Sequence, residues 1–408
     1  MESNASMFSE RTLQQGLRVA IFSECYRPTR NGVVSSVETF REHLSKLGCH
    51  VKVFAPSYPG YNETDEDVHR FPSFCFTTYV EYPIAIPLAI EPWRKLGQFA
   101  PHIVHVHSVF WLTRFAGYWA KRRRIPLVLT YHTLVTEYLH YVPLPKTLAR
   151  MLAIKLSKDF CNMCDLVIVP SPAVIPILRS YGVKTEIVPL PTGVEIESFQ
   201  GGDGASIRKQ YGIPQDAIVL LYAGRIGLEK NIEFLLKATS IVLREYENTY
   251  LLLVGPGPYL SRAMRTASSL NCSHRIIFAG GHPRERMRDF YASADVFVSA
   301  SLTETQGLSI AEAMAAGLPC VAINAHGVSW AFEDGVHGFL SPNDKRAFAE
   351  RVRWLISNRA LRKRMGDAAR KHVEENLSPS SIAMRLLQLY RSLLCERQTQ
   401  PPVHLLSS

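Results

Sequence analysis

Short apolar runs alternate with amphipathic helical stretches along almost the whole chain. Residues 17–23 form an apolar run typical of a buried strand, and residues 33–47 place Val34, Val37 and Phe40 on one stripe of a predicted helix. Such alternation favours a parallel sheet with helices on both faces. Further strands of this first half are predicted at 51–55, 103–107, 125–131, 165–170 and 186–189.

A segment rich in proline and glycine, residues 189–204, interrupts this alternation and is predicted to be a hinge. Beyond it the pattern restarts, so the chain is expected to be α/β, with two doubly wound Rossmann-like domains. Strands are predicted at 217–223, 250–254, 275–279 and 294–299, and helices at 232–244, 259–270, 283–292, 310–316, 348–356, 361–376 and 382–394.

Residues 301–320 carry the most suggestive chemistry. The predicted order is strand, loop, helix, strand, and such a loop lies at the carboxyl ends of the strands, where open α/β sheets bind ligands. The chain turns at Gly307, and the amides from Gly307 and Leu308 onward open a helix and suit a phosphate. Glu304 in the loop and Glu312 in the first helical turn are expected to accept hydrogen bonds from hydroxyls, which indicates a sugar or a ribose.

Glu312 also has a purely structural interpretation. Ser309 and Glu312 have the spacing of a capping box, in which the glutamate only reaches back to the amide at the start of the helix. Glu304 has no such role available, because it lies in the turn before the helix.

Residues 224–231 follow another predicted strand and bring Arg225 and Lys230 to the same edge of the sheet. Two fixed cations there would neutralise a diphosphate, although two solvated surface bases are the simpler alternative. Gly255 lies in one more strand-end turn, where a backbone without a side chain can approach a ligand closely.

The first half of the chain also places loops at the carboxyl ends of its predicted strands, where such sheets bind ligands. The loop 24–32 contains Arg27 and ends at Gly32 before a helix, which is either another anion-binding turn or a plain connection. The strand at 103–107 carries two histidines on one face, and the next strand ends at His132. A lone histidine is often only structural, but His132 is placed at the edge where ligands bind.

The stretch 146–160 predicts an amphipathic helix with two interpretations. Leu148, Leu152 and Leu156 share one side, so the helix either packs these leucines on the core or lies on an anionic bilayer. The opposite half-circle carries the basic residues Lys146, Arg150, Lys155 and Lys158.

The composition and charge of the chain exclude few classes of binding partner. The 408 residues carry a formal net charge of +10, with a pI near 9.2, which favours nucleic acid, nucleotide-sugar phosphates or an acidic membrane surface. No clustered aromatic and basic module supports nucleic acid. No run approaches the roughly 18 apolar residues that a membrane span needs, and the amino terminus is polar, so we expect a cytoplasmic protein.

Other chemistries find little support. The eight cysteines are scattered, and Cys161 with Cys164 is a single CxxC within a predicted helix, so reduced core thiols are expected. The chain has neither a Walker sequence nor a G-x-G-x-x-G after its first strand, which argues against P-loop phosphoryl transfer and Rossmann hydride transfer.

The sequence resembles the retaining glycosyltransferases of family 4, which have the GT-B fold of two facing Rossmann-like domains. The resemblance is carried by Arg225 and Lys230, together with Glu304 and, eight residues later, Glu312. The resemblance spans residues 17–394. It implies that Arg225 and Lys230 bind the diphosphate of a nucleotide-diphospho-sugar, and that Glu312 binds the ribose. It also implies that Glu304 and the amides after Gly307 bind the donor sugar.

The resemblance further implies that the Gly32 loop closes on the phosphates and that His132 lies between donor and acceptor. The expected bounds are 17–192 for an acceptor-binding domain, 193–377 for a nucleotide-sugar-binding domain and 378–395 for a helix returning to the first domain. Disordered tails are expected at 1–16 and 396–408.

Within this family, the sequence around residues 303–308 and the stretches near His132 and Glu137 are most similar to the glucosyltransferases that act on diacylglycerol. Gln306 replaces the phenylalanine of many relatives, a feature shared with the lipid enzymes. The similarity implies UDP-glucose as donor, diacylglycerol as acceptor, and a membrane surface bound by the helix 146–160. One departure is Trp330, which stands where relatives often have a glutamate.

No carboxylate is placed as a nucleophile, so front-face substitution is the expected mechanism, with the leaving phosphate deprotonating the acceptor. No metal is expected, because two cationic side chains take its role at the diphosphate. The alternatives are a mannosyltransferase acting on phosphatidylinositol, a glycosyltransferase acting on a soluble sugar, and an inactive protein that binds a nucleotide-sugar.

Overall fold

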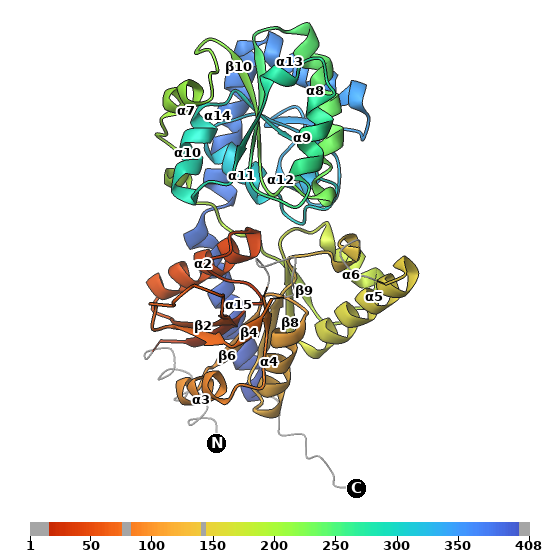
Figure 1. The fold of residues 1–408 in the computed structure, drawn as a ribbon. Helices are drawn as coiled ribbons and strands as arrows, with labels where there is room; N and C mark the ends of the chain where they lie inside the picture. The colour runs from red at the N-terminus through yellow and green to blue at the C-terminus, as the bar shows by residue number, and fades with distance from the viewer. Residues whose placement is uncertain (1–15, 76–82, 140–143, 400–408) are drawn as a thin grey trace. The chain divides into compact units, whose positions relative to one another are not determined.

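The computed structural model describes residues 16–75, 83–139 and 144–399, and it divides the chain into two compact units (Figure 1). The N-terminal unit comprises Met1–Gly193 together with Pro379–Ser408, and the C-terminal unit comprises Val194–Ser378. No helix in the described part of the chain is long and apolar enough to cross a bilayer.

The N-terminal unit is built on a parallel sheet with the strand order β3-β2-β1-β6-β7-β8-β9. Because β1 pairs with both β2 and β6, the chain changes direction across the sheet at β1, and the loops after β1 and β6 diverge there. The strands are β1 (Arg18–Phe22), β2 (His50–Pro56), β3 (Val68–Phe71), β6 (Ile103–Val106), β7 (Leu127–Thr130), β8 (Leu166–Val169) and β9 (Ile187–Pro189).

The helix α2 begins at a side-chain cap. Asn31 caps α2 by accepting a hydrogen bond from the Val34 amide over 2.9 Å. The helix α15, from Pro379 to Thr399, packs beside α2. The other helices are α3 (Ile90–Phe99), α4 (Trp111–Arg122), α5 (Lys146–Met163) and α6 (Val174–Ser180), and α2 itself spans Gly32–Lys46.

The C-terminal unit has a second parallel sheet, with the order β12-β11-β10-β13-β14-β15. Leu220 of β10 packs into the core on one face and Leu221 into the core on the other, which explains why these strands are continuously apolar. The strands are β10 (Ile218–Ala223), β11 (Thr249–Val254), β12 (Ile276–Gly280), β13 (Val296–Ser299), β14 (Cys320–Ile323) and β15 (Gly338–Ser341).

Helices cover both faces of this sheet, so the expected pair of doubly wound domains is confirmed. The helices are α7 (Gly204–Gln210), α8 (Ile232–Glu245), α9 (Leu260–Ser268), α10 (Arg284–Ala292), α11 (Leu308–Ala315), α12 (Val328–Ala331), α13 (Lys345–Ser357) and α14 (Arg359–Asn376).

Some expected boundaries differ from the structure. No strand was predicted between residues 55 and 103, but the structure has the edge strand β3 there, whose two central residues are polar and interrupt the apolar pattern. A small antiparallel pair, β4 (Ser73–Phe74) with β5 (Ile84–Ala85), was also missed. The helix α15 continues to Thr399, beyond the expected end at 395, and the tails 1–15 and 400–408 lie outside the described residues.

Candidate active site

The strand order of the C-terminal sheet brings two predicted loops together. β10 pairs with β13, and both strands run in the same direction, so the loops that leave their carboxyl ends start side by side. One loop carries Arg225 and Lys230 and the other carries Glu304. This is the point where the strand order reverses, which is the usual ligand-binding position of such sheets.

Lys230 and Glu304 form an ion pair across these two loops. The Lys230 Nζ lies 2.5 Å from Glu304 Oε1, and both side chains are only 18% exposed. Burial raises the pKa of Glu304, but the charge and hydrogen bond of Lys230, together with Ser301, hold the pKa below its ordinary value. Glu304 is therefore a carboxylate at neutral pH, and the loops bring together two of the predicted site residues.

The backbone around Arg225 is held rigidly. The Tyr222 hydroxyl donates to the Arg225 carbonyl over 2.8 Å, and the Ile226 amide donates to the Pro256 carbonyl over 2.8 Å. The Arg225 guanidinium lies 3.9 Å from the carboxylate of Glu229, whose side chain is almost fully buried. Glu229 was not predicted as a site residue, although its position four residues after Arg225 was a signal.

Gly255 has a packing role that explains its residue type. Its φ is +140°, and an added Cβ would lie 2.0 Å from the Gly224 carbonyl oxygen. The turns after β10 and β11 therefore meet backbone to backbone, and only glycine fits there. A direct contact between Gly255 and a ligand stays a prediction.

The helix α11 begins two residues earlier than the capping-box interpretation requires. Gly307, with φ +81°, is its N-cap residue, and the Ile310 and Ala311 amides both donate to the Gly307 carbonyl. Glu312 is the fifth helical residue, so its expected place in the first turn is wrong, and so is a capping box with Ser309 as the cap.

Glu312 instead accepts a hydrogen bond from a residue of the neighbouring helix. The Tyr291 hydroxyl of α10 donates to Glu312 Oε2 over 2.9 Å. Burial raises the pKa of Glu312, while the Arg284 charge and the Tyr291 hydrogen bond oppose that rise. Tyr291 was not predicted, because nothing in the local sequence shows that α10 and α11 are neighbours.

The loop before α11 contains two further polar groups. Gln306 is buried next to Gly307. The hydroxyl oxygen of Thr303 is buried and has no hydrogen-bond partner among the described residues. A buried hydroxyl without a partner is unfavourable by itself, and a ligand hydroxyl or phosphate would satisfy it.

The turn that carries Trp330 supports the Glu304 loop. The Gly327 amide donates to the Glu304 carbonyl over 2.8 Å, and an added Cβ on Gly327 would lie 2.3 Å from the Thr305 carbonyl carbon. Gly327 was not predicted as a site residue. Trp330, on α12, is 60% exposed in the same turn, and the structure gives no account of why tryptophan stands there.

The other predicted site residues, His132 and Gly32, belong to the N-terminal unit. His132 follows β7 and is hydrogen-bonded to His107, and Gly32 is the first residue of α2. Arg27, within the loop 24–32, forms an ion pair with Glu38 of α2. Whether His132 and Gly32 act on the donor stays a prediction.

Glu24 adds a carboxyl group to this edge of the N-terminal sheet. It follows β1 and accepts hydrogen bonds from the Thr113 amide over 3.1 Å and the Thr113 hydroxyl over 3.4 Å. Burial raises the pKa of Glu24 to about 7, against the lowering effect of those hydrogen bonds. Thr113 also lies 3.1 Å from the Ser108 hydroxyl, next to His107.

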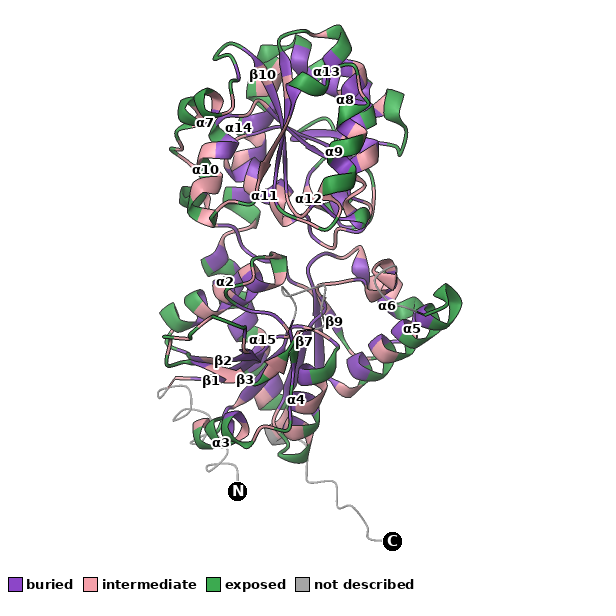
Figure 2. Ribbon diagram, in the orientation of Figure 1, coloured by how far each residue is buried: buried purple, intermediate pink, exposed green. Residues whose placement is uncertain are grey.

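The helix α5 faces the core with small residues, with Phe160 and with the partly buried Leu156, and not with Leu148 or Leu152. Ala149, Ala153 and Ser157 are buried, and the Ser157 hydroxyl lies 2.9 Å from the Tyr131 hydroxyl. The interpretation in which the leucines face the core is therefore wrong for Leu148 and Leu152, which are exposed. The four predicted basic residues of α5 are exposed as well (Figure 2).

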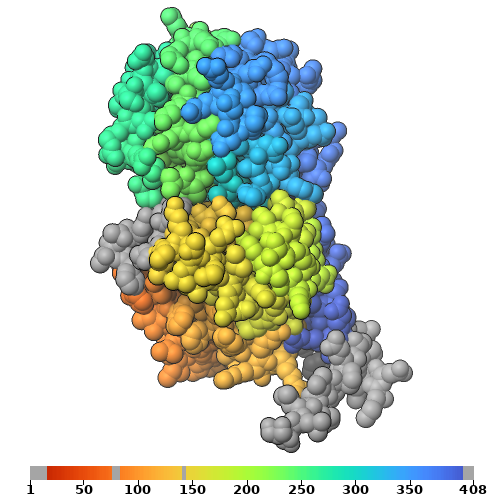
Figure 3. All heavy atoms as spheres, turned by 90° about the vertical axis from the view of Figure 1, so that its right-hand side faces the viewer, coloured from red at the N-terminus to blue at the C-terminus, as the bar shows by residue number. Residues whose placement is uncertain are grey.

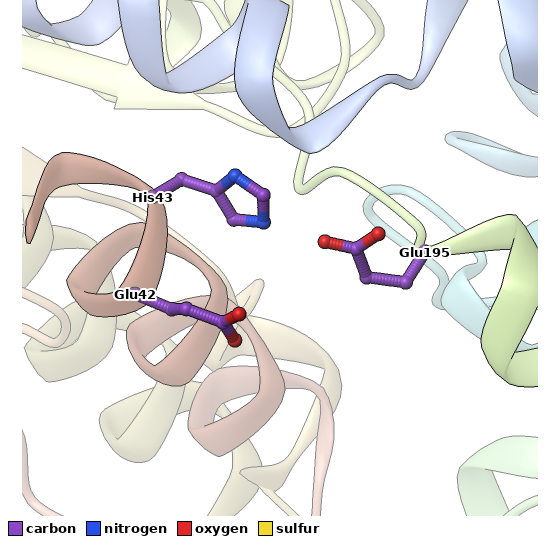
Figure 4. A group of neighbouring side chains, drawn as sticks. All are labelled: Glu42, His43 and Glu195. Atoms are coloured by element: carbon purple, nitrogen blue, oxygen red, sulfur yellow. The ribbon is translucent and has the colours of Figure 1, made fainter. Parts of the chain in front are cut away.

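Cys161 and Cys164 were expected to be reduced thiols of the core, and no metal site was expected. Cys161 and Cys164 are buried and form no disulfide, and burial raises the pKa of Cys161 to about 12. One group of three potential metal ligands occurs in the described part of the chain, made of Glu42, His43 and Glu195 (Figure 4). Glu195 belongs to the C-terminal unit and the other two to the N-terminal unit, so we assign no metal site to them.

Comparison with known families matches almost the whole chain. Residues 203–372 match the family described as Glycosyl transferases group 1, and residues 30–198 match Glycosyltransferase Family 4. An alpha-monoglucosyldiacylglycerol synthase from Acholeplasma laidlawii is 31% identical over 344 residues, which cover 81% of this chain and 86% of the relative. A synthase of the same name from Streptococcus pneumoniae is 31% identical over 312 residues, covering 75% and 71%.

A third relative differs in its named activity. The GDP-mannose-dependent alpha-mannosyltransferase of Corynebacterium glutamicum is 28% identical over 399 residues, covering 94% of this chain and 91% of the relative.

Solved structures show the same fold at lower identity. The sucrose-phosphate synthase of Thermosynechococcus elongatus aligns with a TM-score of 0.76 at 23% identity, covering 93% of this chain and all of that one. HepE from Anabaena, in complex with UDP and glucose, aligns with a TM-score of 0.76 at 18% identity, covering 92% and 100%. These structural matches confirm the predicted GT-B fold. The family models and the two synthases support an enzyme over an inactive binding protein. The chain therefore belongs to glycosyltransferase family 4 and is a hexosyltransferase.

Proposed function

We propose that this hexosyltransferase moves glucose from UDP-glucose to diacylglycerol at a membrane surface, with retention of the anomeric configuration. The observation that carries the chemistry is the Lys230–Glu304 ion pair, because it joins a phosphate-binding cation and a sugar-binding carboxylate at one edge of the sheet. The choice of substrates is supported by the two relatives named alpha-monoglucosyldiacylglycerol synthase.

The donor is bound by cationic side chains, backbone amides and carboxylates of the C-terminal unit. Arg225 and Lys230 bind the diphosphate, together with the first amides of α11, which have no carbonyl partner within the helix. Glu312 accepts hydrogen bonds from the ribose, and Glu304 accepts them from hydroxyls of the transferred glucose. The Thr303 hydroxyl satisfies its hydrogen bonding on the donor. UDP is supported as the nucleotide by the HepE complex, a protein of the same fold.

The transfer is a front-face substitution. The bond between the anomeric carbon and the phosphate oxygen breaks, and the acceptor oxygen bonds to that carbon on the same face. The acceptor hydroxyl proton goes to the leaving phosphate. Negative charge grows on that phosphate as the bond breaks, so Arg225 and Lys230 stabilise the transition state more than bound donor. No divalent metal is required in this scheme.

The exposed side of α5 supports a membrane as the place of reaction. Met151 is 63% exposed, and Leu144, Leu148 and Leu152 are exposed around it. The same helix exposes Lys146, Arg150, Lys155 and Lys158. This part of the chain is yellow in Figure 3, where its atoms lie on the surface. Apolar side chains beside lysines suit the interface of an anionic bilayer, where chains enter the acyl region and ammonium groups meet lipid phosphates.

A second candidate is mannose transfer from GDP-mannose, which the Corynebacterium relative favours. One competition experiment separates the candidates. The full-length protein is given UDP-glucose and GDP-mannose together, with vesicles containing diacylglycerol and phosphatidylinositol and with a soluble disaccharide. Products are read by mass. A hexosyl-diacylglycerol formed at the expense of UDP-glucose supports the proposal, and mannosyl-phosphatidylinositol or a lengthened soluble sugar contradicts it.

A further inference from the structure

Three histidines form a continuous row in the N-terminal unit, in which His105 and His107 are buried and His132 is half-buried. The rings of His105 and His107, on successive inward positions at the end of β6, have centroids 4.3 Å apart. The ring of His132, after β7, stacks on His107 at 5.1 Å, with an interplanar angle of 20°. His107 Nδ1 lies 2.8 Å from His132 Nε2, so these two rings share a hydrogen bond.

His105 holds the far end of the row in place. Its Nδ1 lies 2.6 Å from the Tyr390 hydroxyl of α15, and its Nε2 lies 2.7 Å from the Thr130 hydroxyl. Both nitrogens are therefore occupied, and the ring is fixed between two elements. Phe40 of α2 packs against both His105 and His107, so His107 has little freedom to rotate.

All three rings are neutral at physiological pH. Burial lowers the pKa of His105 and of His132 to about 3, and burial together with the two neighbouring histidines lowers the pKa of His107 well below its ordinary value. A neutral imidazole carries one proton, on one of its two nitrogens. In the hydrogen bond between His107 and His132, one ring therefore donates and the other accepts.

The surroundings of His107 indicate which ring donates. Its Nε2 is buried and has no hydrogen-bond partner among the described residues. If His132 donated to His107 Nδ1, the proton of His107 would be on that Nε2, as a buried N–H without an acceptor. Such orphaned N–H groups are rare, and an unsatisfied acceptor is more readily tolerated. A proton on His107 Nδ1 avoids the buried N–H.

We propose that His107 is a positioning residue for His132: its Nδ1–H donates to His132 Nε2, so that His132 carries its own proton on Nδ1 and acts on the transferred sugar as a neutral hydrogen-bond donor. The proposal rests on the proposed function and on the predicted place of His132 between donor and acceptor. His107 touches neither substrate, and it acts only through the ring that it orients.

Two variants of similar polarity separate positioning from packing. In His107→Asn the side-chain amide stands near the position of Nδ1 and can still donate to His132. In His107→Gln the amide stands near the position of Nε2 and cannot. Both remove the ring, so both are expected to lower the melting temperature. The expected kcat of the Gln variant is about tenfold or more below that of the Asn variant, with an unchanged KM for the donor.

The second measurement reads the proton directly. The protein is labelled with ¹⁵N-histidine, and the His132 signals are identified by their loss in His132→Gln. Two-bond nitrogen–proton correlations then show which nitrogen carries the proton. We expect it on Nδ1 in the wild type. A proton on Nε2, or equal kcat values for the Asn and Gln variants, overturns the proposal.

The role of His107 and the proposed function can be disproved independently of each other. If the wild type transfers no hexose, the proposed function fails, and the nitrogen signals of His132 still decide the role of His107. If the variants do not fold, the wild-type signals alone decide it.

Discussion

At the scale of residues, the Lys230–Glu304 ion pair contributes to the stability of the folded chain as well as to the proposed chemistry. Removing the ammonium leaves a mostly buried carboxylate without its counter-ion. The variant Lys230→Met is therefore expected to lower the free energy of unfolding by about 1–3 kcal/mol. Urea denaturation measures this, with Lys237→Met, an exposed lysine of α8, as the control that should change little.

The same pair predicts a dependence of stability on pH. Since the folded pKa of Glu304 lies below its ordinary value of 4.5, its contribution is fully present above pH 4.5 and is lost as the pH falls through the folded pKa. The double variant Lys230→Met with Glu304→Gln is a reference without either charge. The difference in free energy of unfolding between wild type and this variant should decrease as the pH is lowered below 4.5. A difference that stays constant to pH 3 would argue against the assignment.

Glu312 should show the opposite sign. Its folded pKa is raised, so ionisation destabilises the native state as the pH rises from 4.5 through the folded pKa. Glu312→Gln cannot ionise and is expected to gain stability relative to wild type across that window. The lost carboxylate should weaken UDP binding about tenfold, as measured by calorimetry. Unchanged UDP affinity would remove the ribose from the proposed contacts of Glu312.

At the scale of elements, the turn around Gly327 positions the Glu304 loop. In Gly327→Ala the new methyl group would overlap the Thr305 carbonyl, so the loop has to move. A shift of about 1 Å at a reacting group can cost about 100-fold in rate. We expect kcat to fall by about 10- to 100-fold, whereas Gly97→Ala, where an added Cβ meets nothing within 4 Å, should leave kcat unchanged. Equal kcat in both variants would show that the turn does not position Glu304.

The outward side of α5 predicts binding to vesicles. Replacing Leu148, Met151 and Leu152 by serine removes apolar side chains that would enter the bilayer, and co-sedimentation with phosphatidylglycerol vesicles should weaken about tenfold or more. Met384→Ser, at another exposed apolar position, is the matched control. Binding that survives the triple substitution, or that does not respond to salt, would place the membrane contact elsewhere.

The orientation of α5 also shows where sequence reasoning ends. A helix with leucines on one stripe and lysines on another is amphipathic on any helical wheel, but the wheel does not say which stripe faces the protein. Here Ala149 and Ala153 allow close packing, and Leu148 and Leu152 face outward, while Leu156 packs against the core. The neighbour of the helix decides its orientation, and that neighbour is not local in sequence.

At the scale of the whole molecule, the fold could be predicted because most of the buried strands are short apolar runs that alternate with amphipathic helices. The meeting of Lys230 and Glu304 could be predicted as well, since each follows a strand and parallel strands end at one edge. The hydrogen bond from Tyr291 to Glu312 could not, because it depends on how two helices pack. The boundary at Thr399 could not either, because a polar helix end resembles a tail.

The most direct test is the initial rate of glucosyl-diacylglycerol formation from UDP-glucose, measured in excess chelator for wild type and for Lys230→Ala in parallel. The account predicts that the wild type keeps its full rate with chelator, because Arg225 and Lys230 stabilise the leaving diphosphate. It predicts that Lys230→Ala falls by about 100-fold in kcat, with a smaller change in KM for the donor. A wild type inactivated by the chelator, or a variant that turns over normally, would contradict it.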